Sequence, residues 1–370
     1  MNSTRFLTFS QYMFLHFLHI FFIFTLLISM AEARNSLLTY ISDDNGKTWS
    51  QKITEIKNLS TKGAVDPSPI LLKNGDILLY VLGSNVTSGD PGKSQPDNTW
   101  RMIVARSNDN GKSFEEVGVA YSQKSNMTDP FPVLLPSGEF RLYLSKGASV
   151  FSATSKDGIS FKKDKGLRSS KGKGGVPGAL VLKDGSVILY VCKEKNILYK
   201  ISKDGMKFKK SGIAIKAPKG TSLCDPSPVV NPSGGYTMAY KVRKPADSKN
   251  PKDDIIMLAD SVDGKEWITR TEPVGVGSVP GLVIDSKGVW HIYASGVPLA
   301  QLSGSTENKK KPKHKKWMMF RNPPPKIKEC FLNFLTSKEI NTLAEVGKPD
   351  DQILFNKGRQ ALKNCTKQNN

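Results

Sequence analysis

The sequence predicts an all-β protein whose main part, residues 36–300, is a five-bladed β-propeller, followed by a small helical hairpin. Three observations lead to this prediction: a turn motif that recurs five times, a two-strand motif that alternates with it, and an offset between the two at the ends of the region. Repeats of about fifty residues are typical of propellers, in which each blade buries its faces against its neighbours.

The turn motif reads Ser-x-Asp, then Gly, then an aromatic residue. Its copies begin at Ser42, Ser107, Ser155, Ser202 and Ser261. Asp and Gly favour tight turns, because Gly adopts positive φ at no steric cost and the Ser and Asp side chains can bond the backbone of the turn. The aromatic residue then packs the returning strand into the core. The motif therefore predicts five equivalent hairpins.

The two-strand motif opens with a residue before proline, runs through two short apolar strands separated by a turn with Gly, and ends at Tyr. Its copies open at Asp66, Asp129, Val176, Asp225 and Val279, which are spaced by 63, 47, 49 and 54 residues. A third and a fourth strand, joined by the Ser-x-Asp turn, follow the first four copies. Each repeat is thus predicted to be a four-stranded antiparallel meander.

The two motifs are out of phase at the ends of the region. The first Ser-x-Asp turn, at residues 42–49, has no two-strand motif before it, and the last two-strand motif, at residues 279–293, has no such turn after it. Joined, they complete a fifth blade whose outer strands come from residues 37–57. This closure by the N-terminus would remove the open sheet edge.

The first 33 residues have the organisation of a secretory signal peptide. Arg5 precedes an apolar stretch at residues 14–30, and Ala31-Glu32-Ala33 fits a cleavage site after Ala33. The alternative is an uncleaved signal anchor, because the stretch is nearly long enough to span a bilayer. We expect a secreted protein with no stable membrane insertion after cleavage.

Secretion gives meaning to four sequons and four cysteines. Patterns for N-glycosylation begin at Asn58, Asn85, Asn126 and Asn364. The four cysteines allow three pairings. We favour Cys330–Cys365, which would staple the C-terminal segment, and Cys192–Cys224, which lie in consecutive repeats. No CxxC motif or His cluster indicates a metal site, and we expect no cofactor.

The charge is strongly positive. Lys and Arg number 54 against 33 Asp and Glu, a formal net charge of +21. This excess excludes an acidic mimic of another polyanion and favours anionic partners, of which we expect a glycan or a similar anionic ligand rather than nucleic acid. The alternative is that the charge only keeps the surface soluble. The sequence does not indicate an oligomeric state.

The Ser-x-Asp motifs resemble the Asp boxes of sialidases and related secreted propellers, and the Asp-Pro strand openings resemble five-bladed glycoside hydrolases such as arabinanases, xylosidases and invertases. Together the motifs cover about 260 residues. Asp boxes are specific for propeller-like folds but not for an activity, because they are turn structures. The resemblance implies a secreted, exo-acting glycosidase.

Strand direction locates the expected site. Because the four strands of a blade alternate in direction, the start of the first strand shares a face with the loop between the second and third strands. Two of these loops are long, at residues 83–100 and 242–254. Long loops around the strand openings predict a ligand mouth there, with the Ser-x-Asp turns on the opposite face as structural elements.

The resemblance also implies roles for the blade-opening aspartates. Asp66 matches the general base of the five-bladed glycosidases and Asp129 the residue that modulates the pKa of their acid. Their acid is a Glu that opens the third blade, where this chain has Val176, and Asp225 is the candidate acid from across the ring. The alternative is that all three carboxylates bond backbone amides at the strand openings.

Trp100, Arg101 and Arg243 are candidate substrate-binding residues near the mouth. Trp can stack on a sugar face, although packing between blades is an equal alternative, and Arg can clamp a carboxylate with two hydrogen bonds. Sialidases use three such Arg residues, but the spacing here matches no Arg-Ile-Pro signature, and the predicted propeller has five blades rather than six.

The C-terminal region departs from the repeat. Residues 301–326 form a basic and Pro-rich linker, in which the Lys-rich run 309–316 is a solvated loop or a heparin-like contact. Residues 327–370 show helical spacing with a capping box at Thr336-Ser-Lys-Glu339, which predicts a disulfide-closed helical hairpin. Function stays open between a glycoside hydrolase and a non-catalytic glycan-binding or protein-interaction propeller that has lost the general acid.

Overall fold

A computed structural model describes residues 36–84, 99–209, 211–250, 253–295, 320, 325–346 and 352–367. The predicted signal peptide, the sequon at Asn85 and the basic run 309–316 lie outside these residues. The chain divides into two compact units, Met1–Gln301 and Leu302–Asn370. None of the helices that the structure describes is long and apolar enough to cross a bilayer.

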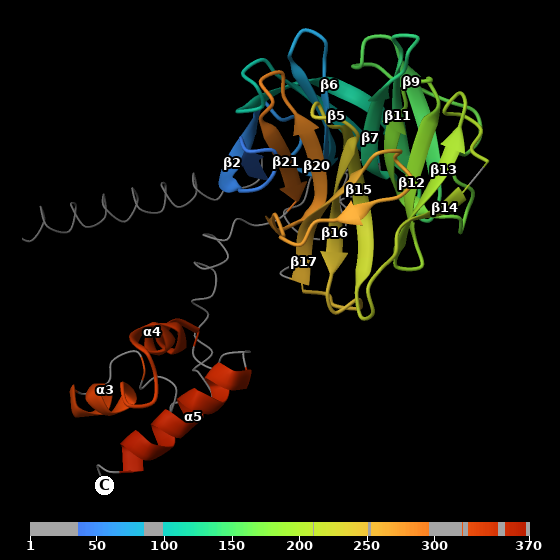
Figure 1. Ribbon diagram of the computed structural model, residues 1–370. Helices are drawn as coiled ribbons and strands as arrows, with labels where there is room; N and C mark the ends of the chain where they lie inside the picture. Colours follow the sequence, from blue (N-terminus) through green and yellow to red (C-terminus); the bar gives the residue numbers. More distant parts are fainter. Residues whose placement is uncertain are drawn as a thin grey trace, which may run out of the picture. The chain divides into compact units, whose positions relative to one another are not determined.

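The first unit is the five-bladed propeller that the sequence predicts, which Figure 1 shows as sheets arranged about one axis. Blade 1 contains β3 (Gly63–Leu71), β4 (Ile77–Ser84), β5 (Trp100–Ser107) and β6 (Phe114–Gln123). Blade 2 contains β7 (Thr128–Leu134), β8 (Phe140–Ser145), β9 (Val150–Ser155) and β10 (Lys162–Lys163). Blade 3 contains β11 (Gly175–Val181), β12 (Val187–Lys193), β13 (Asn196–Ser202) and β14 (Ser211–Ile215).

Blade 4 contains β15 (Ser222–Val230), β16 (Tyr236–Arg243), β17 (Asp254–Ser261) and β18 (Ile268–Thr269), and β19 (Gly275–Val276) also pairs with β17. Blade 5 combines β20 (Ser278–Ile284) and β21 (Trp290–Ser295) with β1 (Ser36–Ser42) and β2 (Ser50–Lys57). The N-terminal strands thus close the ring as predicted, with Thr39 opposite Tyr293 in the antiparallel β1–β21 pair.

Blades 5 and 1 are also joined along their outer strands, which the sequence did not indicate. β2 pairs in parallel with β6 at Ile56–Phe114 and Lys57–Glu115. The two blades therefore form one continuous eight-stranded sheet.

The core lies between neighbouring blades. β4 has both faces buried, because Leu78 and Tyr80 pack with residues of blade 2, such as Leu142, while Leu79 packs on the other face with Tyr293 of blade 5. A strand buried on both faces needs an unbroken apolar run rather than an alternating pattern. This explains why the second strands of the blades read as continuous apolar segments.

The Ser-x-Asp turns have the predicted hydrogen bonds, and a tyrosine ties them to the neighbouring blade. In blade 1, Ser107 Oγ accepts the Gly111 N–H at 2.8 Å and Asp109 Oδ1 accepts the Lys112 N–H at 3.0 Å. Tyr293 of blade 5 donates its hydroxyl proton to the Gly111 carbonyl at 3.0 Å. Gly111 is required there, since it has a φ of 74° and an added Cβ would lie 2.2 Å from the Tyr293 hydroxyl.

The same tyrosine contact recurs at three more blade interfaces and is replaced at one. Tyr80 bonds Gly158 O, Tyr143 bonds Gly205 O, and Tyr190 bonds Gly264 O. Between blades 4 and 5, Arg270 takes this role with Nη1 at 3.1 Å from Gly46 O. Asp260 holds the Arg270 guanidinium with two hydrogen bonds of 2.7 and 2.9 Å.

Within the described residues of the second unit there are three helices where the sequence predicts a hairpin: α3 (Pro325–Phe331), α4 (Ser337–Val346) and α5 (Gln352–Lys367). The additional helix begins at the last residue of the Pro-Pro-Pro break, because proline is well suited to the first helical position. The capping box is present, with Glu339 N–H donating to Thr336 Oγ1 at 3.2 Å and Thr336 N–H to Glu339 Oε2 at 2.8 Å. A disulfide joins Cys330 and Cys365.

Candidate functional site

The residues that open the five blades share one unusual backbone geometry. In every blade the ladder between the first and second strands shifts by one residue at this point, which is a β-bulge. The residues at the bulge have φ between 50° and 57°: Asp66, Asp129, Val176, Asp225 and Val279. Proline follows each of them, since the second bulge position has no ladder partner for an N–H. A bulge re-aims a side chain, and here it is repeated five times around one axis.

The bulges surround a narrow axial cavity of about 20 Å³, which is room for about one water molecule. It is lined by Pro67, Ser68, Asp129, Pro130, Phe131, Val176, Pro177, Asp225, Pro226, Ser227, Val279 and Pro280. Two of the predicted aspartates, Asp129 and Asp225, therefore meet at the cavity from blades 2 and 4, and Val176 occupies the third-blade position.

Three of the five bulge N–H groups are bonded by the second strand of the preceding blade. Ser295 Oγ accepts the Asp66 N–H at 3.0 Å and Ser145 Oγ accepts the Val176 N–H at 2.6 Å. The Asp225 N–H lies 3.3 Å from Cys192 Sγ. Each acceptor stands two residues after the Tyr that ends the two-strand motif.

For the other two bulge N–H groups, the acceptor is the carboxylate of the aspartate that opens the preceding blade. The equivalent second-strand residues are the apolar Leu82 and Val242. Asp66 Oδ2 accepts the Asp129 N–H at 3.3 Å, and Asp225 Oδ2 accepts the Val279 N–H at 3.1 Å. These two carboxylates thus take part in blade packing, as the alternative interpretation expects.

Asp129 differs from the other two because, among the residues that the structure describes, its carboxylate accepts no bulge N–H. It accepts the Thr128 hydroxyl proton at 2.6 Å, and Ser145 Oγ bonds the next bulge N–H. Burial, followed by the nearby charge of Asp129, raises the pKa of Asp66 to about 8. Burial, followed by the charge of Asp225, raises the pKa of Asp129 to about 6. Adjacent acids that are largely withdrawn from water share protons, so this pair retains a proton at neutral pH.

Lys241 is a site residue that the sequence analysis missed. Its Nζ lies 2.7 Å from Asp225 Oδ2 and 3.1 Å from Ser278 Oγ. Burial alone would lower the pKa of the Lys241 ammonium, but the ion pair with Asp225 outweighs burial and raises it. Its position in the repeat could have identified it. Lys241 directly follows the motif Tyr, where the other four blades have an apolar residue.

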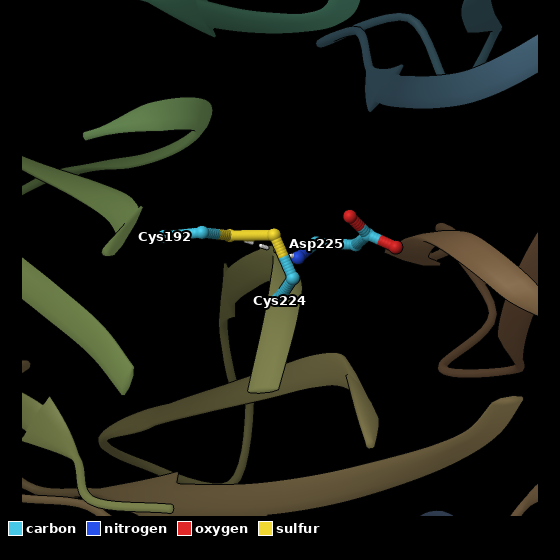
Figure 2. A group of neighbouring side chains, drawn as sticks. All are labelled: Cys192, Cys224 and Asp225. Atoms are coloured by element: carbon cyan, nitrogen blue, oxygen red, sulfur yellow. Dashed lines mark hydrogen bonds between the residues drawn. A yellow bond between two sulfur atoms is a disulfide. The ribbon is translucent and has the colours of Figure 1, made fainter. Parts of the chain in front are cut away.

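A disulfide joins Cys192 of β12 to Cys224 of β15, next to Asp225, which is the pairing that the sequence favours (Figure 2). The two sulfurs and a carboxylate oxygen of Asp225 lie within 4.8 Å of one another. The two sulfurs are bonded to each other, and the Asp225 carboxylate extends away from the disulfide (Figure 2). The disulfide therefore cross-links blades 3 and 4 beside the axis.

The three predicted substrate-binding residues each have their own contacts within the protein, and their role in substrate binding stays a prediction. Trp100 packs, half-buried, against the apolar cluster between blades 1 and 2. Arg101 Nη1 lies 3.4 Å from Thr99 O. Arg243 forms a bidentate ion pair with Asp254 at 2.6 and 2.7 Å, which raises the pKa of the guanidinium.

Three of the four sequons lie within the described residues. Asn58, Asn126 and Asn364 are exposed. The Asn58 amide donates a hydrogen bond of 2.7 Å to Glu115 Oε1.

Comparisons with known proteins give structural similarity alone. No family profile matches the chain, and no curated protein sequence matches it. The chain is similar to a thermostable family-43 glycoside hydrolase, with 17% identity over 62% of this chain and 83% of that one and a TM-score of 0.49. It is also similar to an endo-arabinase from Bacteroides thetaiotaomicron, with 14% identity, 63% and 94% coverage and a TM-score of 0.47. The chain is similar, too, to an endo-1,4-beta-xylanase from the same organism, with 18% identity over 62% of this chain and 84% of that one and a TM-score of 0.48.

Proposed function

We propose that the chain is a secreted, carbohydrate-active propeller of the glycoside hydrolase type, with its reaction centre at the axial aspartates. The observation that carries the proposal is the pair Asp66 and Asp129, adjacent carboxyls at the bulges whose pKa values are raised to about 8 and about 6. Glycoside hydrolysis needs one protonated and one ionised carboxyl, and environments that separate two pKa values assign these roles.

The proton of the pair is held on Asp66. Its Oδ2 accepts the Asp129 N–H, so Oδ1 is the oxygen that donates to a glycosidic oxygen. Asp129 is ionised above a pH of about 6 and lines the cavity that has room for one water, so it is suited to activate that water. This arrangement differs from the roles that the family resemblance implies, in which Asp66 is the base, Asp129 modulates the pKa of the acid and Asp225 is the candidate acid. Asp225, whose Oδ2 lies 2.7 Å from Lys241 Nζ, is the third carboxyl group of this site.

Exo action and secretion belong to the same proposal. Exo action rests on the resemblance of the Asp-Pro strand openings to exo-acting five-bladed glycosidases. Two disulfides are typical of proteins from oxidising compartments, which supports secretion. The sequons at Asn58, Asn126 and Asn364 are exposed and suitable for glycosylation in such a compartment.

Glycan binding without turnover is the second candidate. It is favoured by the hydrogen bonds that Asp66 and Asp225 make to neighbouring blades and by Val176 at the position of the implied acid. A carboxylate engaged by a backbone N–H is held in place, which suits recognition of a sugar hydroxyl as well as catalysis.

The test is turnover of aryl arabinofuranosides, xylosides, fructofuranosides and sialosides by the wild type, Asp66→Asn and Asp129→Asn. Asp157→Asn, which changes a carboxylate in the turn of blade 2, is the control. We expect kcat to fall at least about a hundredfold in the first two variants and to stay unchanged in the control. The pH–rate profile should be bell-shaped between about 6 and 8, the values of Asp129 and Asp66.

Binding of the corresponding oligosaccharides by calorimetry separates the two candidates. Binding that Asp129→Asn abolishes, without turnover of any glycoside, establishes the second candidate. If the protein neither turns over nor binds any of these sugars, both candidate functions are overturned.

A further inference from the structure

A second, larger hollow lies on blade 2, away from the axial aspartates. Its volume is about 580 Å³. It is lined by Glu139, Thr154, Ser155, Lys156, Asp157, Ser160, Lys162, Lys163, Asp164 and Lys165. Glu139 follows the turn between β7 and β8, and residues 155–160 form the Ser-x-Asp turn. Because strands alternate in direction, this groove is at the opposite end of the blade from Asp129, and it is independent of the proposed reaction centre.

The acids of this blade 2 groove are already engaged by the protein. Asp157 Oδ1 accepts the N–H groups of Ile159 and Ser160 at 2.8 and 2.9 Å. Asp164 accepts the hydroxyl protons of Ser152 and Thr154 at 2.6 and 2.9 Å. The buried Arg141 lies beneath it, with Nε 3.6 Å from Asp164 Oδ2. The two carboxylates are therefore held by fixed donors rather than by the lysines of the groove.

The four lysines of the groove, by contrast, are unneutralised. Lys156, Lys162, Lys163 and Lys165 are exposed, and none forms an ion pair with any residue that the structure describes. Lys162 and Lys163 make up β10, the two-residue outer strand of blade 2, and Lys163 also lies 4.9 Å from the centre of the buried Phe151 ring. The wall of the hollow thus carries four ammonium groups with no carboxylate partner among the described residues.

The surroundings extend this positive field. Residues 156–209, which run from the groove through β13 of blade 3 to its turn, contain fourteen Lys and Arg and five Asp and Glu, a net charge of +9. Charge of one sign around a hollow concentrates oppositely charged ligands. This segment therefore carries a large part of the net charge of the whole chain, +21.

We propose that the blade 2 groove binds a sulfated polysaccharide. Lysine presents a compact charge with three donors, which suits sulfate monoesters spaced along a flexible sugar chain and does not need the bidentate geometry of arginine. Single-stranded nucleic acid is disfavoured, because the lining residues include no aromatic side chain on which a base could stack. The disulfides are typical of secreted proteins, for which sulfated polysaccharides are available polyanions.

The test measures binding of a fluorescent heparin oligosaccharide to the full chain by anisotropy at physiological salt. The groove variant changes Lys156, Lys162, Lys163 and Lys165 to Gln. The matched control changes Lys47, Lys73, Lys112 and Lys287 to Gln, which removes the same charge from exposed turns at the same end of blades 5 and 1. We expect the Kd to rise at least about tenfold in the groove variant and no more than about twofold in the control. Asp66→Asn should bind like the wild type.

Equal weakening in the groove variant and the control would overturn the proposal, because binding would then follow total charge. Equal affinity for a desulfated or carboxylated chain of the same length, or for a single-stranded oligonucleotide, would also overturn it. Circular dichroism of both variants should match the wild type, and a groove variant that has lost its fold would be replaced by the single substitutions Lys162→Gln and Lys163→Gln with the same expectation of direction.

Discussion

Aspartates at the two ends of the blades have opposite electrostatics, although they belong to the same repeat. At the turn end, the Ser160 N–H and further donors of the turn lower the pKa of Asp157 to about 2, and the Met206 N–H and its neighbours lower that of Asp204 to about 2. At the axial end, burial raises the pKa of Asp66 to about 8. Hydrogen bonds from fixed donors lower the pKa values at the turn end, and removal from water raises the pKa at the axial end.

The two groups of carboxylates therefore have opposite effects on the free energy of unfolding. An acid with a lowered pKa stabilises the folded state when it is ionised, whereas an acid with a raised pKa destabilises it at neutral pH. Unfavourable charge that persists in a repeat protein is expected at a functional site, where stability is exchanged for chemistry. At the axial end, the Lys241–Asp225 ion pair and the Cys192–Cys224 disulfide connect residues beside these carboxyl groups.

The largest effect is expected from Lys241→Met. It leaves the Asp225 carboxylate, whose side chain is 4% exposed, without its cation. Breaking a buried pair on one side costs about 3 kcal/mol or more, so urea unfolding should show a loss of this size. The double change Lys241→Met with Asp225→Asn should recover most of it. If the single variant is as stable as the wild type, the ion pair does not brace the axial end.

Asp66→Asn should stabilise the protein at pH 8 by on the order of 2 kcal/mol. Because the folded pKa of Asp66 is raised to about 8, against an unfolded value of about 4, the folded state retains a proton that the unfolded chain has lost. Stability therefore falls as the pH rises from about 4 to about 8 in the wild type, and asparagine, which has no such proton, should flatten the profile.

Thermal melting at a series of pH values checks this sign. The two proteins should converge near pH 4 and diverge toward pH 8. A wild type that becomes more stable over that interval, relative to the variant, would contradict the raised pKa.

At the turn end, Asp157→Ala should reduce stability by about 1.5 kcal/mol at pH 7, since it removes an acceptor of local backbone N–H groups. The folded pKa of Asp157 is lowered to about 2, so its contribution is present above about pH 4 and is lost as the pH falls toward 2. Melting of variant and wild type at pH 7 and at pH 2.5 should show a difference that shrinks in acid. A difference that grows in acid would remove the contrast between the two ends.

The smallest effect is expected from Val176→Asn, which should increase stability by about 1 kcal/mol. Val176 has a φ of 55°, a conformation that is costly for a β-branched residue and is well tolerated by asparagine. Chemical denaturation measures the gain, and Val181→Asn on the same strand is a control that should only destabilise. No gain at Val176 would mean that its side-chain packing offsets the backbone strain.

The fold was predictable because each repeat can be recognised from residues that lie close together in the sequence. The Ser-x-Asp turns depend on residues two to four positions apart, and the ring closure follows from counting two such motifs. The parallel β2–β6 pairing and the Arg270 contact with Gly46 were not predictable, because they join residues far apart in sequence and have no repeat to reveal them.

The site was predictable in position but not in its hydrogen bonds. The Asp-Pro openings located Asp129 and Asp225 at one cavity. Which carboxylate bonds a neighbouring blade depends on the residue two places after the motif Tyr, and comparing Ser145 with Leu82 would have indicated this. The environments of Trp100 and Arg243 follow from tertiary contacts with the core cluster and with Asp254, which no local pattern encodes.

The pairing of β1 with β21 has a consequence for biosynthesis. The chain emerges from the ribosome with residues 36–57 first, yet their partners at residues 290–295 are made more than two hundred residues later. β1 and β2 can pair with each other at once and β2 with β6 soon after, but the other edge of β1 stays open until β21 is made. Maturation of the ring is thus expected to follow synthesis rather than accompany it, and folding helpers that shield the open edge should act on this segment.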